Sequence, residues 1–278
     1  MARMTARVAS RITAGLKRFH PILDSARARD INESDTVVIV ADLLQYVLGY
    51  DKYSEITSEY AIRGTYCDLA VKVDGRLALL IEVKAIGLDL KDNHVKQAVD
   101  YAANQGCEWV VLTNGVLWRA YKILFAKPIT HELVLDLNLC SINPKNDEDL
   151  GLLWLLTKEG LQKSGLADYH AQREALSRFT LGAILTSGGI LDVLRRELRR
   201  VSPEARISTE EIHAVLVADV LKREVLEGEK AEAARKIVAR VAARALRSKP
   251  VPSAVRQPGV AVDTISPAAV APPPPAPL

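Results

Sequence analysis

Apolar positions in the first half of the chain switch between helical and strand spacing. Residues 4–18 predict a short helix, and a second helix follows Asn32 and stops at Gly49. Extended runs follow at 56–60, 67–73 and 77–84, then a helix over 92–104 and strands over 109–113 and 117–123. The stretch 131–136 fits an edge strand or a loop. This order predicts an α/β fold in which helices flank a mixed sheet.

Two dipeptides, Asp74-Gly75 and Asn114-Gly115, separate consecutive strands of this pattern. Both combinations favour the positive φ angles of tight hairpin turns. The sequence therefore predicts two antiparallel hairpins within the sheet.

The second half of the chain changes to helical spacing after the polar loop Asn143–Asp149. Within it, Ser208 and Glu211 have the spacing of a capping box. The end of the chain is rich in Pro and Ala, and we expect disorder there because too little surface can be buried to offset the ordering entropy. The expected segments are a basic N-terminal helix (1–30), the α/β domain (31–145), an all-helical region (150–248) and a disordered Pro-rich tail (249–278).

Composition excludes several classes of protein. The formal net charge is only +3, but basic residues gather near the ends, and Arg3, Arg7 and Arg11 share one helix face that is either solvated or in contact with DNA. The three cysteines have no metal-binding spacing, so we expect small buried residues in a reducing compartment. No apolar run reaches the roughly 18 residues of a membrane span and no leader is recognisable, which predicts a cytoplasmic protein without membrane contact.

The strand over 77–84 ends in Ile81-Glu82-Val83-Lys84. Side chains alternate along a strand, so Glu82 and Lys84 point to one side while Ile81 and Val83 enter the core. A charged pair at the end of a buried strand is unfavourable unless a partner such as a divalent cation is present. Such a triplet by itself is most often a solvated ion pair, so its neighbours decide its meaning.

Asp68 lies on the partner strand of the same hairpin. Asp68 lies on the same side as Glu82 only if the two residue numbers in each cross-strand pair add up to 148 or 150. A loop with an odd number of residues would produce such a sum. A strict two-residue turn gives 149 and sends Asp68 to the other side of the sheet. The sequence therefore commits the site to one register.

In that register, Asp68, Glu82 and the backbone carbonyl of Val83 predict a Mg²⁺ site, in which Mn²⁺ can substitute. The ion would activate a water and offset charge on a phosphate, and Lys84 would orient or help deprotonate that water and stabilise the transition state. Gln97 and Tyr101 lie one helical turn apart and are expected over the site, where Gln97 would hold a water or phosphate and Tyr101 would bond Lys84 or a DNA backbone. His94 precedes them by one turn and is more readily a surface residue.

Several motifs occur in a fixed order: Asp35-Thr36, Leu43-Leu44, Leu48-Gly49-Tyr50, Cys67-Asp68-Leu69, the Glu82–Lys84 triplet, Gln97 with Tyr101, and Leu112-Thr113-Asn114-Gly115 followed by Trp118 and Tyr121. With them, residues 35–121 resemble the N-terminal nuclease domain of type I restriction enzyme R subunits in a stand-alone form. The resemblance implies a restriction-endonuclease-like fold over 31–145, with the PD-(D/E)xK site and metal-dependent phosphodiester cleavage. It also implies a further acidic metal ligand on the first core helix, Asp35 or Glu33, with Glu59 a weaker substitute.

Basic residues also line the helical region, and Arg195, Arg199, Lys236 and Arg240 are candidates for contacts to nucleic acid. Solvated helix faces explain the same pattern, and the opposite Leu/Val faces allow a homo-oligomer interface. The sequence does not separate these alternatives.

The leading functional hypothesis is a Mg²⁺-dependent DNA endonuclease of the restriction or defence type. No GxxxxGK[ST] motif occurs, so we expect no motor activity. A free nuclease would threaten its own genome, which favours gating by a specificity or regulatory partner protein. The alternatives are a nucleic-acid-binding or regulatory module that keeps the fold without cutting, and a helical scaffold whose sheet domain only docks partners.

Overall fold

The computed structural model describes residues 4–62 and 65–247, which fall into two compact units, Met1–Ser177 and Arg178–Leu278. Arg3 and the tail at 249–278 that we expected to be disordered lie outside the described residues. The boundary between the units follows Ser177, so the prediction of a boundary in the Asn143–Asp149 loop is wrong. The helices after that loop belong to the core of the first unit.

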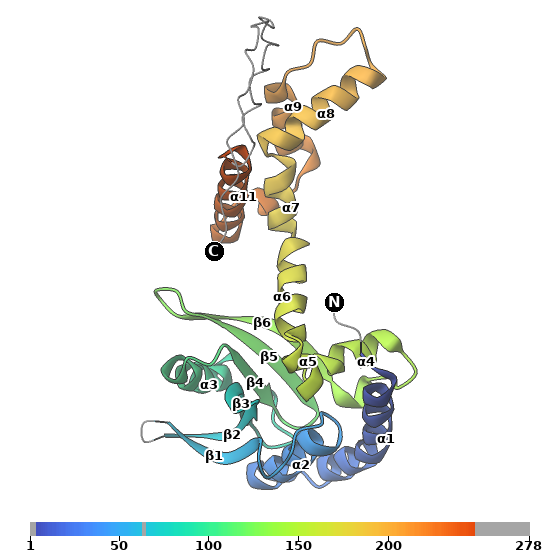
Figure 1. Cartoon of the computed structure of the whole chain (residues 1–278), viewed down its shortest axis with the longest axis vertical. Helices are drawn as coiled ribbons and strands as arrows, with labels where there is room; N and C mark the ends of the chain where they lie inside the picture. Colours follow the sequence, from blue (N-terminus) through green and yellow to red (C-terminus); the bar gives the residue numbers. More distant parts are fainter. Residues whose placement is uncertain (1–3, 63–64, 248–278) are drawn as a thin grey trace, which may run out of the picture. The chain divides into compact units, whose positions relative to one another are not determined.

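The first unit is built on one six-stranded sheet whose strands lie in chain order (Figure 1). The strands are β1 (Ile56–Ile62), β2 (Thr65–Val73), β3 (Arg76–Val83), β4 (Trp109–Thr113), β5 (Leu117–Leu124) and β6 (Thr130–Asn138). All neighbours are antiparallel except β3 and β4, which are parallel and are connected through helix α3 (Asp92–Gln105). The predicted mixed sheet flanked by helices is confirmed, and the stretch around 131–136 is an edge strand.

Both faces of the sheet are covered, which explains why β4 is apolar throughout. Trp109 and Val111 belong to one core cluster with helices α1 (Ala6–Ala28) and α2 (Glu33–Tyr46), whereas Val110 and Leu112 belong to a second cluster with α3. A strand buried on both faces has no place for polar residues. The Glu82–Lys84 end of β3 therefore lies beside the most deeply buried part of the sheet.

Helix α1 is longer and more deeply buried than the sequence predicted. It runs through Pro21 to Ala28 instead of ending near residue 18, and its face at Val8, Ile12, Leu16, Phe19 and Leu23 is at most 4% exposed. Burying this continuous face outweighs the one helical hydrogen bond that proline removes. The N-terminal helix is thus part of the α/β core, and the expectation of a separate basic segment over 1–30 is wrong.

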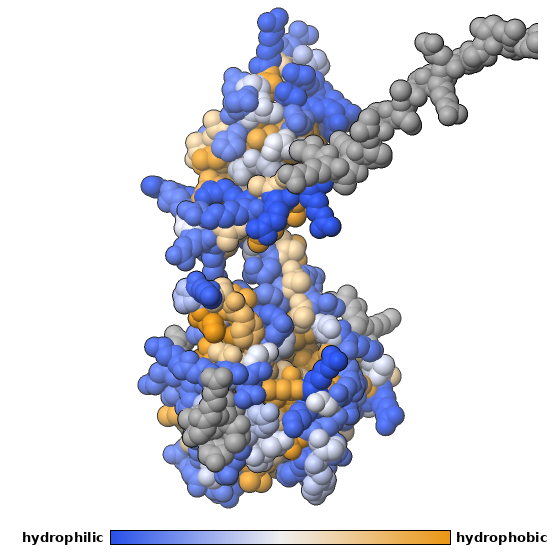
Figure 2. Space-filling view, turned by 60° about the vertical axis from the view of Figure 1, so that its left-hand side comes forward, coloured by the Kyte–Doolittle hydropathy of each residue, from blue (hydrophilic) through white to orange (hydrophobic). Residues whose placement is uncertain are grey.

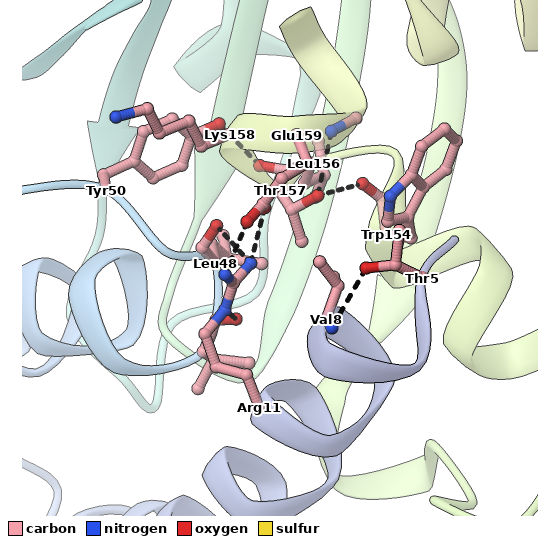
Figure 3. Close-up of polar contacts among 12 residues, drawn as sticks. Thr5, Val8, Arg11, Leu48, Tyr50, Trp154, Leu156, Thr157, Lys158 and Glu159 are labelled. Carbon is pink, nitrogen blue, oxygen red and sulfur yellow. Dashed lines mark hydrogen bonds and ion pairs between the residues drawn. The ribbon is translucent and has the colours of Figure 1, made fainter. Parts of the chain in front are cut away.

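Arg11 joins three parts of the first unit (Figure 3). Its guanidinium forms two 2.6 Å bonds to the carboxylate of Glu159 and donates to the carbonyls of Val47 and Leu48. The next residue, Gly49, has φ +86°, and a Cβ there would lie 2.5 Å from Cζ of Arg11. A glycine is therefore required, and Arg11 is neither a solvated side chain nor a DNA contact as expected from its helix face.

Helices α4 (Asp147–Trp154), α5 (Lys158–Gln162) and α6 (Gly165–Ala175) complete the first unit. The buried side chains of Leu153, Trp154 and Leu166 lie in the same core cluster as α1 and α2. The Tyr50 hydroxyl also donates to the Leu156 carbonyl at 2.7 Å. These contacts, drawn in part in Figure 3, hold the first helices after the polar loop to the α/β core.

The second unit is helical, as predicted. It contains α7 (Arg178–Leu185), α8 (Gly188–Val201), α9 (Thr209–Val215), a π-helical turn (Leu216–Val220), α10 (Arg223–Leu226) and α11 (Glu229–Arg247). The capping box at the start of α9 is confirmed, with Ser208 and Glu211 bonding each other's backbone N–H. This unit also exposes large apolar side chains, including Val201 and Val241, and Figure 2 shows such surface between its charged residues.

Among the described helices, none has both the length and the apolar character needed to cross a bilayer.

Candidate functional site

The β2–β3 hairpin brings Asp68 into register with Glu82, by a route the sequence did not show. Asp74 and Gly75 form a strict two-residue turn with φ of 51° and 75°, and Val73 pairs with Arg76. A register shift between Val71 and Lys72 then leaves Ala78 as an extra residue, so that Leu69 pairs with Ile81 and Ala70 with Leu80. These paired numbers add up to 150. The predicted register is confirmed, but the odd-length loop offered as its cause is wrong, because a bulge within the strands supplies the extra residue.

Asp68 reaches across to the end of β3. Its Oδ2 accepts a 2.7 Å hydrogen bond from the backbone N–H of Val83, which fixes the carboxylate at the strand end. Burial raises the pKa of Asp68, while the bond from Val83 and the charge of Lys84 act to lower it. The remaining oxygen, Oδ1, is the atom of this carboxylate that a ligand would use.

Glu82 and Lys84 form a close ion pair beneath the surface. The Lys84 ammonium donates a 2.8 Å bond to Oε1 of Glu82, which confirms that the two side chains turn to the same side. Glu82 is 2% exposed, and burial, with a smaller contribution from the charge of Asp68, raises its pKa to about 7. Burial alone would lower the pKa of Lys84, but the hydrogen bond and charge of Glu82 outweigh it and raise that pKa, so Lys84 is a cation at neutral pH.

Glu33 is the acidic residue of α2 that approaches this pair. Its Oε2 lies 3.4 Å from Nζ of Lys84. Asp35 is exposed, and its backbone N–H instead donates to the Asn32 side chain that caps the helix. Glu33, Glu59 and Asp68 also line one surface pocket of about 320 Å³. The geometry thus brings together Glu33 and Glu59 with Asp68, and leaves Asp35 on the helix surface.

Thr113 at the end of β4 and Asn114 directly after it position Lys84 and the segment that follows, a role that their sequence pattern did not predict. The Thr113 carbonyl accepts the backbone N–H of Lys84 at 2.8 Å. The buried Asn114 side chain donates to the carbonyls of Ile86 and Leu88 and accepts from the N–H groups of Val116 and Leu117. Asn114 therefore ties the segment that follows Lys84 to the β4–β5 turn. The Asn114-Gly115 dipeptide predicts a turn, but it does not indicate that the Asn114 side chain also holds the segment after Lys84. That contact depends on the pairing of β3 with β4, which are distant in sequence.

Helix α3, which was predicted to cover the site, directs the side-chain hydrogen bonds of Gln97 and His94 to partners within or directly before the helix. Gln97 donates a 2.7 Å hydrogen bond to the Tyr101 hydroxyl, and Tyr101 is buried in the α3 core cluster. Lys84 bonds Glu33 and Glu82 among the described residues, so the expected bond from Tyr101 to Lys84 is not formed. His94 accepts the backbone N–H of Lys91 and caps its own helix. A role for Gln97 and Tyr101 toward water, phosphate or DNA stays a prediction.

The donor set of the hairpin fits a hard divalent cation. Oε2 of Glu82 is buried and has no hydrogen-bond partner among the described residues. An unpartnered buried carboxylate oxygen is strongly unfavourable, and a cation removes that penalty. Asp68, Glu82 and the Val83 carbonyl offer only oxygen atoms, which is the chemistry that Mg²⁺ and Mn²⁺ take.

The remaining predicted residues lie in the second unit. Arg195 and Arg199 are on α8, and Lys236 and Arg240 are on α11. Arg195 is paired with Asp192 at 2.9 Å, whereas Arg199, Lys236 and Arg240 are exposed. Contacts from these side chains to nucleic acid stay a prediction.

The mixed sheet thus places two acids and a lysine, Asp68, Glu82 and Lys84, together at one strand end. The family model described as "type I restriction enzyme R protein N terminus" matches residues 39–133, about a third of the chain. The resemblance predicted from the motifs is therefore confirmed over this stretch, which holds Asp68, Glu82 and Lys84. No curated protein and no solved structure matches the chain.

Proposed function

We propose that the first unit is a Mg²⁺-dependent nuclease that hydrolyses phosphodiester bonds of DNA. The observation that carries this proposal is the buried Glu82 carboxylate near Asp68, which has one oxygen on Lys84 and the other without a partner among the described residues. The family match supports a restriction or defence role, since it covers the same hairpin. The ion and the reaction are our inference from this donor set.

Each side chain has a distinct part in the proposed reaction. Asp68 and Glu82, with the Val83 carbonyl, would hold the ion, which would supply an activated water and offset the charge of the phosphate. The bond from Val83 to Oδ2 keeps Asp68 oriented without any ligand. Lys84 is protonated and would orient the water and stabilise the pentacovalent transition state, so the alternative role of accepting a proton is disfavoured.

The second candidate is a module that binds nucleic acid or regulates a partner without cutting. The site argues against it, because an unpartnered buried carboxylate lowers stability and a binding module gains nothing from keeping it. A gating or specificity protein remains part of the proposal, since no element that reads bases is identified among the described residues of the first unit.

A plasmid-nicking assay with Mg²⁺ or Mn²⁺ tests the proposal. We compare the wild type with Glu82→Gln and Lys84→Ala, and use Lys52→Ala as the matched control because Lys52 forms an ion pair with Asp42 at the surface of the same unit. Nicking that is lost in both site variants and kept in the control supports the enzyme. DNA binding without any nicking by the wild type favours the second candidate, and nicking retained by both site variants refutes this site.

A further inference from the structure

A second set of side chains with the atoms to ligate a metal lies on the opposite edge of the sheet from β1. Glu132 on the edge strand β6 and His170 and Glu174 on α6 each offer one ligand atom, and these atoms lie within 4.8 Å of one another. His170 and Glu174 are four residues apart, so they share one helix face, which is turned toward β6. None of these residues contributes to the Asp68–Glu82 site.

The two elements are held together independently of any ion. Arg173 of α6 donates to the backbone carbonyl of Val134 on β6. The His170 ring packs edge-on against Trp109, with centroids 6.3 Å apart, and its Nε2 lies 3.2 Å from Oε2 of Glu132. Helix α6 and strand β6 lie side by side in Figure 1. A ligand that needs both elements would therefore meet side chains that are already oriented.

We propose that Glu132, His170 and Glu174 bind a divalent transition-metal ion of the Zn²⁺ type, which fastens α6 to the edge strand β6. One imidazole nitrogen and two carboxylates make a mixed donor set, which favours Zn²⁺ and its first-row neighbours over Mg²⁺. With His170 neutral, the two carboxylates balance the charge of the ion. Three protein ligands leave the rest of the coordination sphere to water.

The consequence is local to the first unit. Helix α6 is the last helix before its boundary at Ser177, and β6 has a strand neighbour on one side only. An ion that joins them would stabilise the end of this unit.

Calorimetric titration of the EDTA-treated full chain with Zn²⁺ tests this site. We expect about one equivalent to bind, with affinity at least tenfold weaker in His170→Ala and in Glu132→Gln, in line with the roughly 10–100-fold effects of disturbed metal sites. Glu132→Gln keeps a hydrogen-bond acceptor for His170 and guards against a folding defect. Asp168→Asn, an exposed acid on the same helix, is the matched control and should bind as the wild type does.

Two further comparisons make the result decisive. The binding event lost in His170→Ala should persist in Glu82→Gln, which removes a ligand of the proposed nuclease site, and this separates the two sites. Zn²⁺ should also raise the unfolding midpoint of the first unit in the wild type but not in His170→Ala, followed by tryptophan fluorescence, since all three tryptophans lie in that unit. The proposal is overturned if no Zn²⁺ binds, or if binding is unchanged in both ligand variants, as it would be for an ion bound elsewhere on the chain.

Discussion

Replacing Glu82 with Gln should abolish nicking and yet stabilise the metal-free protein at alkaline pH. Glu82 is 2% exposed, its Oε2 has no hydrogen-bond partner in the part of the chain that the structure describes, and its pKa is raised from 4.5 to about 7. Because the folded state holds this proton more tightly than the unfolded chain, the associated stability is complete below pH 4.5 and is lost as the pH rises through 7. Glutamine carries no charge at any pH and escapes this loss.

The size of the effect follows from the shift. One pKa unit corresponds to about 1.36 kcal/mol, so the penalty on the ionised carboxylate approaches about 3 kcal/mol at pH 8 and is below about 1 kcal/mol at pH 5. Relief from it should make Glu82→Gln more stable than the wild type by about 1–3 kcal/mol at pH 8, and the gain should shrink toward pH 5. Mg²⁺ should stabilise the wild type and leave the variant unchanged.

Urea unfolding in EDTA at pH 5 and pH 8, followed by tryptophan fluorescence, measures this difference. Trp109, Trp118 and Trp154 all belong to the first unit, so the signal reports the unit that contains Glu82. Glu148→Gln, an exposed carboxylate on α4, serves as the control and should show no comparable gain. A variant that is less stable than the wild type at pH 8, or a gain that is equal at both pH values, would refute the reasoning.

Three other substitutions probe how the first unit supports the site. Arg11→Ala should lower the free energy of unfolding by about 1–3 kcal/mol in urea titrations because it leaves Glu159 and two carbonyls without their donor, whereas exposed Arg7→Ala should change it little. Gly49→Ala should destabilise by at least about 1 kcal/mol, measured as a lower melting temperature, since the residue has φ +86° and faces Arg11; a neutral result would contradict the glycine requirement. Asn114→Ala should reduce both the stability and the nicking rate, because four hydrogen bonds are lost and two of them hold the segment after Lys84; full activity would show that this segment needs no such support.

Local patterns determined most of the elements and the chemistry of the candidate site. Strand alternation put Ile81 and Val83 in the core and turned Glu82 and Lys84 together, and the spacing after Asn32 gave α2 with its cap. These features depend on neighbours two to four residues away, so the sequence displays them directly.

Features that depend on distant parts of the chain were decided only by the tertiary structure. The register of Asp68 is set by the bulge at Val71–Lys72 and not by the turn. The position of such a bulge depends on the free energy of pairing along the whole hairpin, which no short stretch of sequence displays. Arg11 meets Glu159 across more than half the chain, and Glu33 rather than Asp35 meets Lys84 because of where packing on the sheet places α2. The sequence by itself therefore identified the candidate residues of the site, and long-range packing decided which of them come together.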